Sequence, residues 1–438
     1  MQSVAVLGGG ESGVGAALLA KEKNLSVFVS DYGSIADNYK KELDVHNILF
    51  EERGHSFEKL ISADVIVKSP GIPDDSQIII QLLNEDALVI SEIEFASRYY
   101  DGKVVAITGS NGKTTTASLV YHLLCQSNYN IGLGGNIGYA FSRLLISEIS
   151  YDWIVLEVSS FQLDNVKSFS ADLGMILNIT PDHLDRYNYI MQAYAEAKWK
   201  LAKAISATGT LFLNSDDLWS RKMLDHEMVT CEIAQISFAD PLMGIEGVDV
   251  KKFLKLKGQH NLFNATMAVS VAQRVGLTAS EIETGLSTFS GISHRLESFE
   301  SIDGVEFIND SKATNIDAAS VALNAIDKPI VWILGGVDKG NDYALLSDLV
   351  KSKVKGIICL TKDDSKIRKA FSEENIKILT TQDVSECVEY SMSLATRGDV
   401  VMLSPACASF DLFDNYIDRG NQFKKAVGEF GKSIKHST

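Results

Sequence analysis

A lysine and a run of threonines follow a glycine turn in VVAITGSNGKTTT, residues 104–116. The apolar run that comes first predicts a buried strand, and TTTASLVYHLLC predicts a helix directly after the turn. Backbone N–H groups of such a loop can point at phosphate oxygens from the positive end of the helix. Lys113 would neutralise charge on the β- and γ-phosphates, and the Thr114 hydroxyl could reach Mg²⁺. The stretch favours an ATP site formed by Gly109, Ser110, Asn111, Gly112, Lys113, Thr114 and Thr115.

The glycine spacing of this loop is shorter than usual. The common phosphate-binding loop is G-x-x-x-x-G-K-[ST], and its first glycine would stand where this chain has Ile107. Gly109 lies only three residues before Gly112. The loop is therefore either a shortened phosphate cradle or a plain turn, and the G-K-T-T run between a strand and a helix favours the cradle.

Two more polar residues follow strand-like runs of the same segment. Glu157 ends DWIVLE, and His183 follows GMILNITPDH. In a parallel sheet both positions lie at the edge that carries the phosphate loop, where a carboxylate can hold Mg²⁺. Each residue alone could equally be a solvated loop side chain, but two of them beside such a loop favour a function. Lys198, in AEAKWK, by itself indicates only a solvated helix face, because an ammonium group cannot ligate Mg²⁺.

The chain begins with a second nucleotide-like pattern, SVAVLGGGESGVGAALLAKEKNLSVFVSD. It predicts a strand, a glycine turn, a helix and a second strand, and residues 8–13 satisfy G-x-G-x-x-G. Asp31, at the end of the second strand, could bind a ribose or a base. Taken alone, the pattern favours NAD, although another nucleotide explains it nearly as well.

The last third of the chain contains four polar clusters, two between apolar runs at its start and two directly after strand-like runs. They read HRLE, NDSKATN, GGVDKG and SPACASFDLF, and begin at residues 294, 309, 335 and 404. Each alone could be a polar turn. Together they indicate a pocket for a second substrate at the carboxyl ends of the strands.

The elements that must position these residues divide the chain into three α/β domains. We expect a Rossmann-like domain over residues 1–93, a central P-loop ATPase-like domain with a parallel sheet over 94–291, and a second Rossmann-like domain over 292–438. Apolar runs such as ADVIVKSPGIP, YDWIVLEV, KPIVWILGG and GDVVMLSPA supply the buried strands.

Composition narrows the class of protein. The 438 residues include 45% hydrophobic ones and carry a net charge of −16, without a basic cluster that would favour nucleic-acid binding. No apolar run approaches the length of a membrane span, and the first residues do not form a secretory signal. The five cysteines are scattered and lack C-x-x-C spacing, which favours reduced thiols in a cytoplasm.

In this order, the motifs resemble those of the Mur ligases, which build peptidoglycan precursors. The likeness covers nearly the whole chain and includes TGSNGKTT, GGNIG, LEVSSFQL, TPDHLDR, AEAKWK, GQHNLFNATMA, HRLE, NDSKATN and SPACASFDLF. It is greatest to the members that join D-glutamate to UDP-N-acetylmuramoyl-L-alanine. That family uses the short G-x-x-G-K-[ST] loop, so the residue at Ile107 is no defect.

The resemblance implies a reaction and a set of ligands. ATP phosphorylates the substrate carboxylate, the amine of D-glutamate attacks the acyl phosphate, and a tetrahedral intermediate loses phosphate to leave an amide. The implied ligands are ATP, two Mg²⁺ ions and the two substrates, and the implied enzyme acts in the cytoplasm, we expect as a monomer. In the family, CO₂ carbamylates the lysine at the Lys198 position, which turns a cation into an oxygen donor.

The resemblance also implies a role for individual residues. It places Lys113, Glu157, His183 and Lys198 at the reaction, with Thr114, Glu157, His183 and Lys198 as metal ligands. It adds Asn261, Asn264, Arg295 and Asp310 to the ATP site. The UDP-substrate would contact Gly10, Ser12, Asp31, Tyr32, Ser69, Pro70, Gly71 and Asn136, and D-glutamate would contact Lys312, Thr314, Lys339, Ser409 and Tyr416.

Two positions depart from the family pattern. Tyr32 stands where a small polar residue is more usual near the uracil, and Tyr416 stands where a Phe is usual beside D-glutamate. The D-N-P-R motif of the relatives that add diaminopimelate or lysine is absent from the sequence, which supports D-glutamate.

Three other functions share part of this pattern. An NAD-dependent oxidoreductase would leave TGSNGKTT without a role, and a P-loop switch protein would not explain the first domain. Folylpolyglutamate synthetase shares the ATP and glutamate chemistry, but it lacks a UDP-binding first domain of this type.

Overall fold

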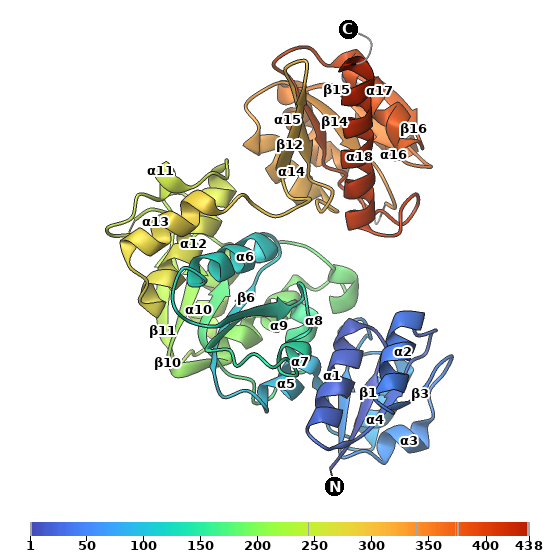
Figure 1. Cartoon of the computed structure of the whole chain (residues 1–438), viewed down its shortest axis with the longest axis vertical. Coiled ribbons are helices and arrows are strands. Elements are labelled where there is room, and N and C mark those ends of the chain that lie inside the picture. Colours follow the sequence, from blue (N-terminus) through green and yellow to red (C-terminus); the bar gives the residue numbers. More distant parts are fainter. Residues whose placement is uncertain (1, 244, 339, 373, 375, 436–438) are drawn as a thin grey trace. The chain divides into compact units, whose positions relative to one another are not determined.

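The computed structural model describes residues 2–243, 245–338, 340–372, 374 and 376–435, and its strands form three sheets (Figure 1). The described chain forms two compact units. The first contains the chain up to Lys255 together with Asn261–Phe289, and the second contains Leu256–His260 and the chain from Ser290 onward. The predicted α/β class is confirmed.

The first sheet has the order β3-β2-β1-β4-β5, with every neighbouring pair parallel. Helices alternate with its strands, as parallel connections require. Its elements are β1 (Ser3–Leu7), α1 (Glu11–Glu22), β2 (Ser26–Ser30), α2 (Asp37–Val45), β3 (Leu49–Glu51), α3 (Phe57–Ile61), β4 (Val65–Lys68), α4 (Gln77–Asn84), β5 (Val89–Ser91) and α5 (Glu92–Ser97).

The second sheet has the order β11-β10-β9-β6-β8-β7 and is also parallel throughout. Its strands are β6 (Lys103–Thr108), β7 (Ile131–Gly135), β8 (Trp153–Glu157), β9 (Ala171–Ile176), β10 (Ile205–Asn214) and β11 (Glu232–Ile236). Its helices are α6 (Lys113–Leu124), α7 (Phe141–Leu144), α8 (Ser160–Leu163), η1 (Leu184–Tyr187), α9 (Met191–Lys203), α10 (Leu218–His226), α11 (Val250–Phe253), α12 (Gln259–Val275) and α13 (Ala279–Thr288).

The third sheet has the order β12-β13-β17-β14-β15-β16 and is mixed, because β12 runs antiparallel to β13 at its edge. Its strands are β12 (Glu297–Ile302), β13 (Val305–Asn309), β14 (Ile330–Leu334), β15 (Val354–Leu360), β16 (Lys377–Thr381) and β17 (Val400–Leu403). Its helices are α14 (Ile316–Ala325), η2 (Tyr343–Leu346), α15 (Ser347–Lys353), α16 (Ser365–Ala370), α17 (Val384–Leu394) and α18 (Tyr416–Lys435).

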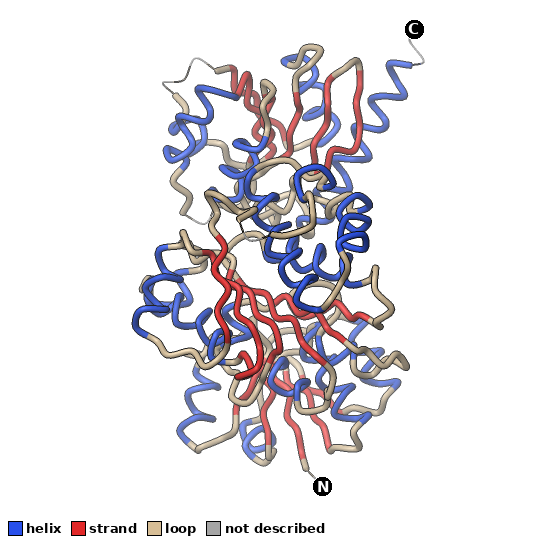
Figure 2. Tube along the Cα trace, turned by 90° about the vertical axis from the view of Figure 1, so that its left-hand side faces the viewer, coloured by secondary structure: helices blue, strands red, loops and turns tan. Residues whose placement is uncertain are grey.

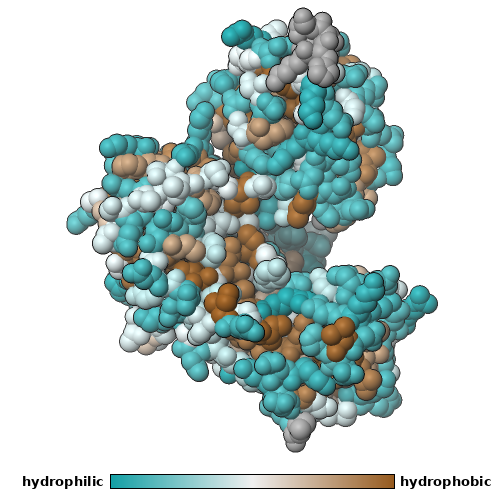
Figure 3. Space-filling view, viewed as in Figure 1, coloured by the Kyte–Doolittle hydropathy of each residue, from teal (hydrophilic) through white to brown (hydrophobic). Residues whose placement is uncertain are grey.

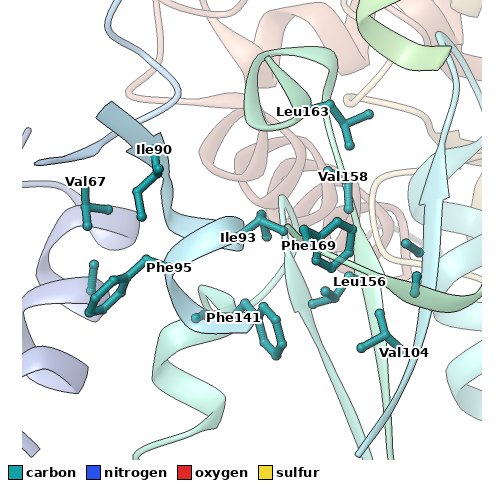
Figure 4. Close-up of a cluster of buried hydrophobic side chains, with 14 of the residues drawn as sticks. Val67, Ile90, Ile93, Phe95, Val104, Phe141, Leu156, Val158, Leu163 and Phe169 are labelled. Carbon is teal, nitrogen blue, oxygen red and sulfur yellow. The ribbon is translucent and has the colours of Figure 1, made fainter. Parts of the chain in front are cut away.

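Central strands are apolar because helices cover both faces of each parallel sheet (Figure 2). All five residues of β8 and all five of β14 are buried. Within the first unit, α5 carries Ile93 and Phe95 into a core that also contains Phe141 and Phe169 (Figure 4). This continuous apolar packing joins the first sheet to the second.

The face shown in Figure 3 is mostly hydrophilic, with hydrophobic residues gathered in separate patches. In the described part of the chain, no helix is long and apolar enough to cross a membrane.

Candidate active site

The phosphate-like loop joins β6 to α6, as its sequence predicts. Gly112 caps α6 with φ +85°, a left-handed conformation that favours glycine. Asn178, just after β9, holds the loop from the neighbouring strand. Its side chain accepts from the Asn111 N–H at 2.8 Å and donates to the Asn111 carbonyl at 3.0 Å, and its own carbonyl accepts from the Ser110 N–H at 2.9 Å. The loop is therefore fixed at the start of α6, where helix N–H groups favour an anion.

Lys113 folds back over this loop. Its Nζ donates to the carbonyls of Gly109 at 2.7 Å and Ser110 at 2.9 Å. Thr114 and Thr115 follow in the first turn of α6, and both are buried. The ammonium group thus lies at the mouth of the loop, where it can meet a phosphate.

Glu157 ends β8, between β6 and β7, where it pairs with Ile107 and Gly135. Its side chain is buried. The Asn136 side chain donates to Glu157 Oε1 at 2.8 Å, and the Asn136 N–H donates to the Glu157 carbonyl at 2.8 Å. Asn136, expected to contact the UDP-substrate, therefore also orients the predicted metal ligand.

Lys198 lies on α9 with only 1% of its surface exposed, so the expectation of a solvated helix face from its local sequence is wrong. Its Nζ donates to the Gly109 carbonyl at 2.9 Å and lies 4.7 Å from the centroid of the Tyr194 ring. Burial, reinforced by the nearby charge of Lys113, holds the pKa of Lys198 well below its ordinary value. The neutral amine is thus more accessible than in an ordinary lysine, and a neutral amine can react with CO₂.

His183 lies between β9 and η1, in a left-handed conformation with φ +50°. Its side chain is half exposed, with Nε2 3.6 Å from a carboxylate oxygen of Asp182. The ring packs edge-on against Phe161 at a centroid distance of 5.4 Å. Phe161 belongs to α8, which begins three residues after Glu157, so the two predicted metal ligands stand on neighbouring segments.

The described side chains do not by themselves complete a metal site. No group of three or more His, Cys, Asp or Glu side chains that could hold a metal ion occurs among the described residues. A buried carboxylate at Glu157 still suits Mg²⁺, which takes oxygen ligands and usually relies on substrate phosphates and water for the rest. The residues therefore fit an ion that is completed by nucleotide phosphates.

In the first sheet, the glycine turn folds as its pattern predicts. Gly8 has φ +97°, and a Cβ at Gly13 would overlap the Gly8 carbonyl oxygen, so both positions require glycine. The Asp31 carboxylate accepts from the Gly9 N–H at 2.6 Å and from the Gly33 N–H at 2.7 Å. Asp31 thus shapes this turn in addition to its predicted ligand contact. Gly10 is the N-cap of α1, Ser12 lies in its first turn, and Tyr32 is 79% exposed.

The predicted adenine contacts lie on α12. Asn264 lies against the phosphate loop, because a Cβ at Gly112 would come within 2.8 Å of its Oδ1. Asn261 is three residues earlier on the same helix, and therefore on the same face. Both belong to the first unit.

The other two predicted ATP residues, Arg295 and Asp310, belong to the second unit. Asp310 is buried at the end of β13, where it accepts from the Ser404 hydroxyl at 2.8 Å and from the Leu296 N–H at 3.1 Å. Burial raises the pKa of its carboxyl to about 7, although these hydrogen bonds and the charge of Arg295 oppose the shift. The Asp310 carboxyl is therefore expected to lose its proton near neutral pH.

The predicted D-glutamate residues also belong to the second unit. The Lys312 ammonium lies 5.3 Å from the centroid of the Tyr416 ring, which brings together two of them. Ser409 is buried and Thr314 half-buried. Lys339 lies outside the described residues.

Arg419 was missed by the sequence analysis. It is buried on α18 and donates to the Ser311 hydroxyl and to the carbonyls of Ser311, Gly335 and Cys407 at 2.8–3.3 Å. It therefore ties together the loops after β13, β14 and β17. The available signal was its position four residues before the buried Phe423, on the apolar face of a helix.

A pocket of about 320 Å³ opens beside these loops in the second unit. Its lining includes Asp338, Thr361, Lys362, Lys366 and Asp411. Of the predicted D-glutamate residues that the structure describes, Lys312, Thr314, Ser409 and Tyr416, none lines it, and the Lys366 ammonium is already paired with Asp338 at 2.8 Å.

Comparison with known proteins gives the family. The MurD N-terminal domain matches residues 4–78, the Mur ligase middle domain matches 107–272, and the Mur ligase glutamate ligase domain matches 294–407. A relative from Bacteroides fragilis, UDP-N-acetylmuramoylalanine–D-glutamate ligase, is 43% identical over 98% of this chain and 100% of its own. The chain belongs to the Mur ligase family.

Solved Mur ligases share the fold. MurF ligase from Thermotoga maritima in complex with ADP superposes with a TM-score of 0.62 over 94% of this chain and 96% of its own, at 16% identity. UDP-N-acetylmuramate–alanine ligase from the same organism gives 0.61 over 98% of this chain and 100% of its own, at 17% identity. The resemblance to Mur ligases expected from the motifs is confirmed, and the oxidoreductase and switch-protein interpretations are set aside.

Proposed function

We propose that the chain joins D-glutamate to UDP-N-acetylmuramoyl-L-alanine in peptidoglycan precursor synthesis, with ATP converted to ADP and phosphate. The main support is a full-length relative of 43% identity that carries the name of this activity. The geometry agrees, because a fixed phosphate loop adjoins a buried carboxylate and a buried lysine.

The first half of the proposed reaction is phosphoryl transfer. A carboxylate is a poor acylating agent until one of its oxygens becomes a phosphate leaving group. Lys113 and the N–H groups at the start of α6 would bind the β- and γ-phosphates and offset the charge that develops on them. The D-glutamate amine would then attack the acyl phosphate, and the tetrahedral intermediate would release phosphate.

Mg²⁺, when bound, would neutralise phosphate charge and polarise the transferred group. Thr114 and Glu157 would hold one ion. His183 and a carbamylated Lys198 would hold a second. The lowered pKa of Lys198 supports this modification, because the neutral amine can attack CO₂ and release a proton to give an anionic carbamate.

The remaining residues are proposed as substrate contacts. Asn261, Asn264, Arg295 and Asp310 would complete the ATP site with Gly109, Ser110, Asn111, Gly112 and Thr115. Gly10, Ser12, Asp31, Tyr32, Ser69, Pro70, Gly71 and Asn136 would contact the UDP-substrate. Lys312, Thr314, Lys339, Ser409 and Tyr416 would contact D-glutamate. We further propose that the enzyme acts in the cytoplasm, where UDP-linked precursors and ATP are present, and as a monomer, since one chain carries all three sets of residues.

Phosphate release tests this function. The assay contains ATP, Mg²⁺ and UDP-N-acetylmuramoyl-L-alanine, with D-glutamate, L-glutamate or no amino acid. We expect release with D-glutamate alone, together with a product heavier by one glutamyl residue. Release with neither isomer would disprove the D-glutamate assignment, and a product with both would disprove its stereospecificity.

A further inference from the structure

The turn after β4 is bound by an arginine of η1, Arg186. This turn, Ser69–Ile72, includes three of the residues proposed to contact the UDP-substrate. The guanidinium of Arg186 donates to three successive carbonyls of the turn: Pro70 at 3.4 Å, Gly71 at 3.3 Å and Ile72 at 3.3 Å. Only an arginine side chain offers enough donors in one rigid plane to serve three carbonyls in this way.

The same guanidinium is linked through one aromatic ring to His183, a proposed metal ligand. It lies 4.4 Å from the centroid of the Phe161 ring, a favourable cation–π distance. That ring also contacts the ring of His183, edge-on at 5.4 Å, and the ring of Tyr187, stacked at 6.1 Å. The Phe161 ring therefore contacts both the guanidinium of Arg186 and the imidazole of His183, two side chains whose backbones are already joined by a hydrogen bond from the Arg186 N–H to the His183 carbonyl at 3.1 Å.

A second set of contacts braces the turn from its other end. The Lys68 ammonium donates to the Ile72 carbonyl at 2.9 Å and pairs with Asp74 at 2.7 Å. Asn165, which follows α8, donates to the Asp74 carboxylate at 3.0 Å. The turn is thus attached to both segments that carry the proposed metal ligands, the one after Glu157 and the one after His183.

We propose that Arg186 is a positioning residue that couples occupancy of the turn Ser69–Ile72 to the placement of His183. The inference rests on the proposed function, because it needs a ligand at the turn and a metal at His183. Arg186 itself touches neither reacting group. A ligand that orders the turn orders the guanidinium, and the guanidinium fixes Phe161 against the imidazole. Coupling of this kind is reciprocal, so metal and nucleotide at His183 also strengthen binding at the turn.

The test compares Arg186→Ala and Arg186→Lys with wild type by calorimetry. The dissociation constant of UDP-N-acetylmuramoyl-L-alanine is measured alone and with Mg²⁺ and a non-hydrolysable ATP analogue, and the ratio of the two values is the coupling. We expect the nucleotide to tighten binding to wild type, and the ratio to approach one in Arg186→Ala. Binding of the UDP-substrate alone should weaken by about tenfold or more, since hydrogen bonds from a charged donor are lost. Arg186→Lys should behave like Arg186→Ala, because an ammonium group cannot reproduce the fork or the ring contact.

Two further variants separate positioning from general stability. Phe161→Leu keeps the arginine but removes the ring, so it should reduce the coupling ratio while leaving most of the affinity for the UDP-substrate. Arg221→Ala is the matched control, because Arg221 is exposed on α10. It should change neither the coupling ratio nor the affinity for the UDP-substrate. The Michaelis constant for D-glutamate should stay near the wild-type value in every variant.

The outcomes are distinct. A wild-type coupling ratio that survives in Arg186→Ala overturns the inference, as does a variant that only lowers the unfolding temperature. Absence of D-glutamate-dependent phosphate release from the wild-type chain contradicts the proposed function itself. Absence of any binding of the UDP-substrate to wild type contradicts both.

Discussion

Burying the charged ammonium of Lys198 costs free energy of folding. Its burial beside the phosphate loop therefore indicates a functional role. Burial and the charge of Lys113 both disfavour its protonated form. We predict that Lys198→Ala lowers D-glutamate-dependent phosphate release by at least about 100-fold, because one anionic metal ligand is lost. A small added carboxylate should restore part of the activity by standing in for the carbamate.

The matched control for this prediction is Lys203→Ala. Lys203 lies on the same helix, but its side chain is 54% exposed and paired with Glu227. It should keep near wild-type turnover, with no response to the added carboxylate. Near-normal turnover of Lys198→Ala would remove this lysine from the mechanism.

Asp310 gives a prediction about pH. Its folded pKa of about 7 lies above the ordinary value of 3.8, so between these two pH values the folded state binds more protons than the unfolded state. The free energy of unfolding therefore falls as pH rises from about 4 to 7, by on the order of 3 kcal/mol. Asp310→Asn, which cannot ionise, should lack this fall.

The measurement is the unfolding temperature of wild type and Asp310→Asn from pH 5 to 8. Their difference should move in favour of the variant as pH rises towards 7 and level off above that value. Asp303→Asn, at an exposed turn with φ +51°, is the control and should follow wild type. Parallel pH curves for wild type and Asp310→Asn would contradict the prediction.

Among the elements, α5 depends on one buried carboxylate. Glu94 accepts from three successive backbone N–H groups, those of Lys167, Ser168 and Phe169, at 2.7–2.9 Å. Burial alone would raise the pKa of Glu94, but these bonds and the Ser168 hydroxyl hold it below its ordinary value. The contact fixes α5, and with it the first sheet, to the segment before β9.

Glu94→Gln should therefore destabilise the first unit by about 2–3 kcal/mol. Its amide oxygen can still serve the three N–H groups, which all donate to Oε2, but the carboxylate charge is lost, and so is the Oε1 acceptor of the Ser168 hydroxyl and the Arg98 guanidinium. The check is denaturant unfolding, in which the midpoint should fall. Glu85→Gln is the control, since Glu85 is exposed at the end of α4. Equal midpoints for the two variants would show that the carboxylate charge of Glu94 does not stabilise the first unit.

The start of α6 supplies another prediction. Gly112→Ala would strain a residue at φ +85° and place a Cβ within 2.8 Å of Asn264 Oδ1. We expect the affinity for a non-hydrolysable ATP analogue to fall by about tenfold or more, since left-handed strain costs about 1–2 kcal/mol before Asn264 is displaced. Gly428→Ala, where a Cβ would meet nothing within 4 Å, should bind normally in the same calorimetric titration. An unchanged dissociation constant for Gly112→Ala would contradict the steric argument.

The sequence predicted strands best where they are buried on both faces. β8 and β14 are continuous apolar runs, and both were expected. The sequence did not predict four edge strands: β3, β7, β11 and β12. These strands are short, glycine-rich or partly exposed, so their hydrophobic pattern is weak. The antiparallel pair of β12 and β13 had one usable signal, the Asp303-Gly304 turn, in which both residues have positive φ.

At the scale of the whole molecule, the sequence predicted local loops well, but it did not predict contacts between residues far apart in the chain. The loop at Lys113 follows from contiguous residues, and so does the glycine turn at Gly8. Burial of Lys198 could not be read from AEAKWK, because it depends on where α9 packs. The bonds from Asn178 to the loop and from Arg419 to three strand ends likewise join residues far apart in the chain. The proposed ligand contacts remain predictions.

The proposed chemistry requires residues of both units to act on the same substrate. The phosphate loop belongs to the first and the predicted D-glutamate residues to the second, yet both must act on one carboxylate. We therefore predict that ligands narrow the range of arrangements between the units. With Mg²⁺, a non-hydrolysable ATP analogue, UDP-N-acetylmuramoyl-L-alanine and D-glutamate together, the radius of gyration from small-angle scattering should fall below that of the free chain. L-glutamate in place of D-glutamate is the matched control and should give less of this change. Identical profiles with and without the full ligand set would mean that the free chain already has the arrangement that catalysis requires.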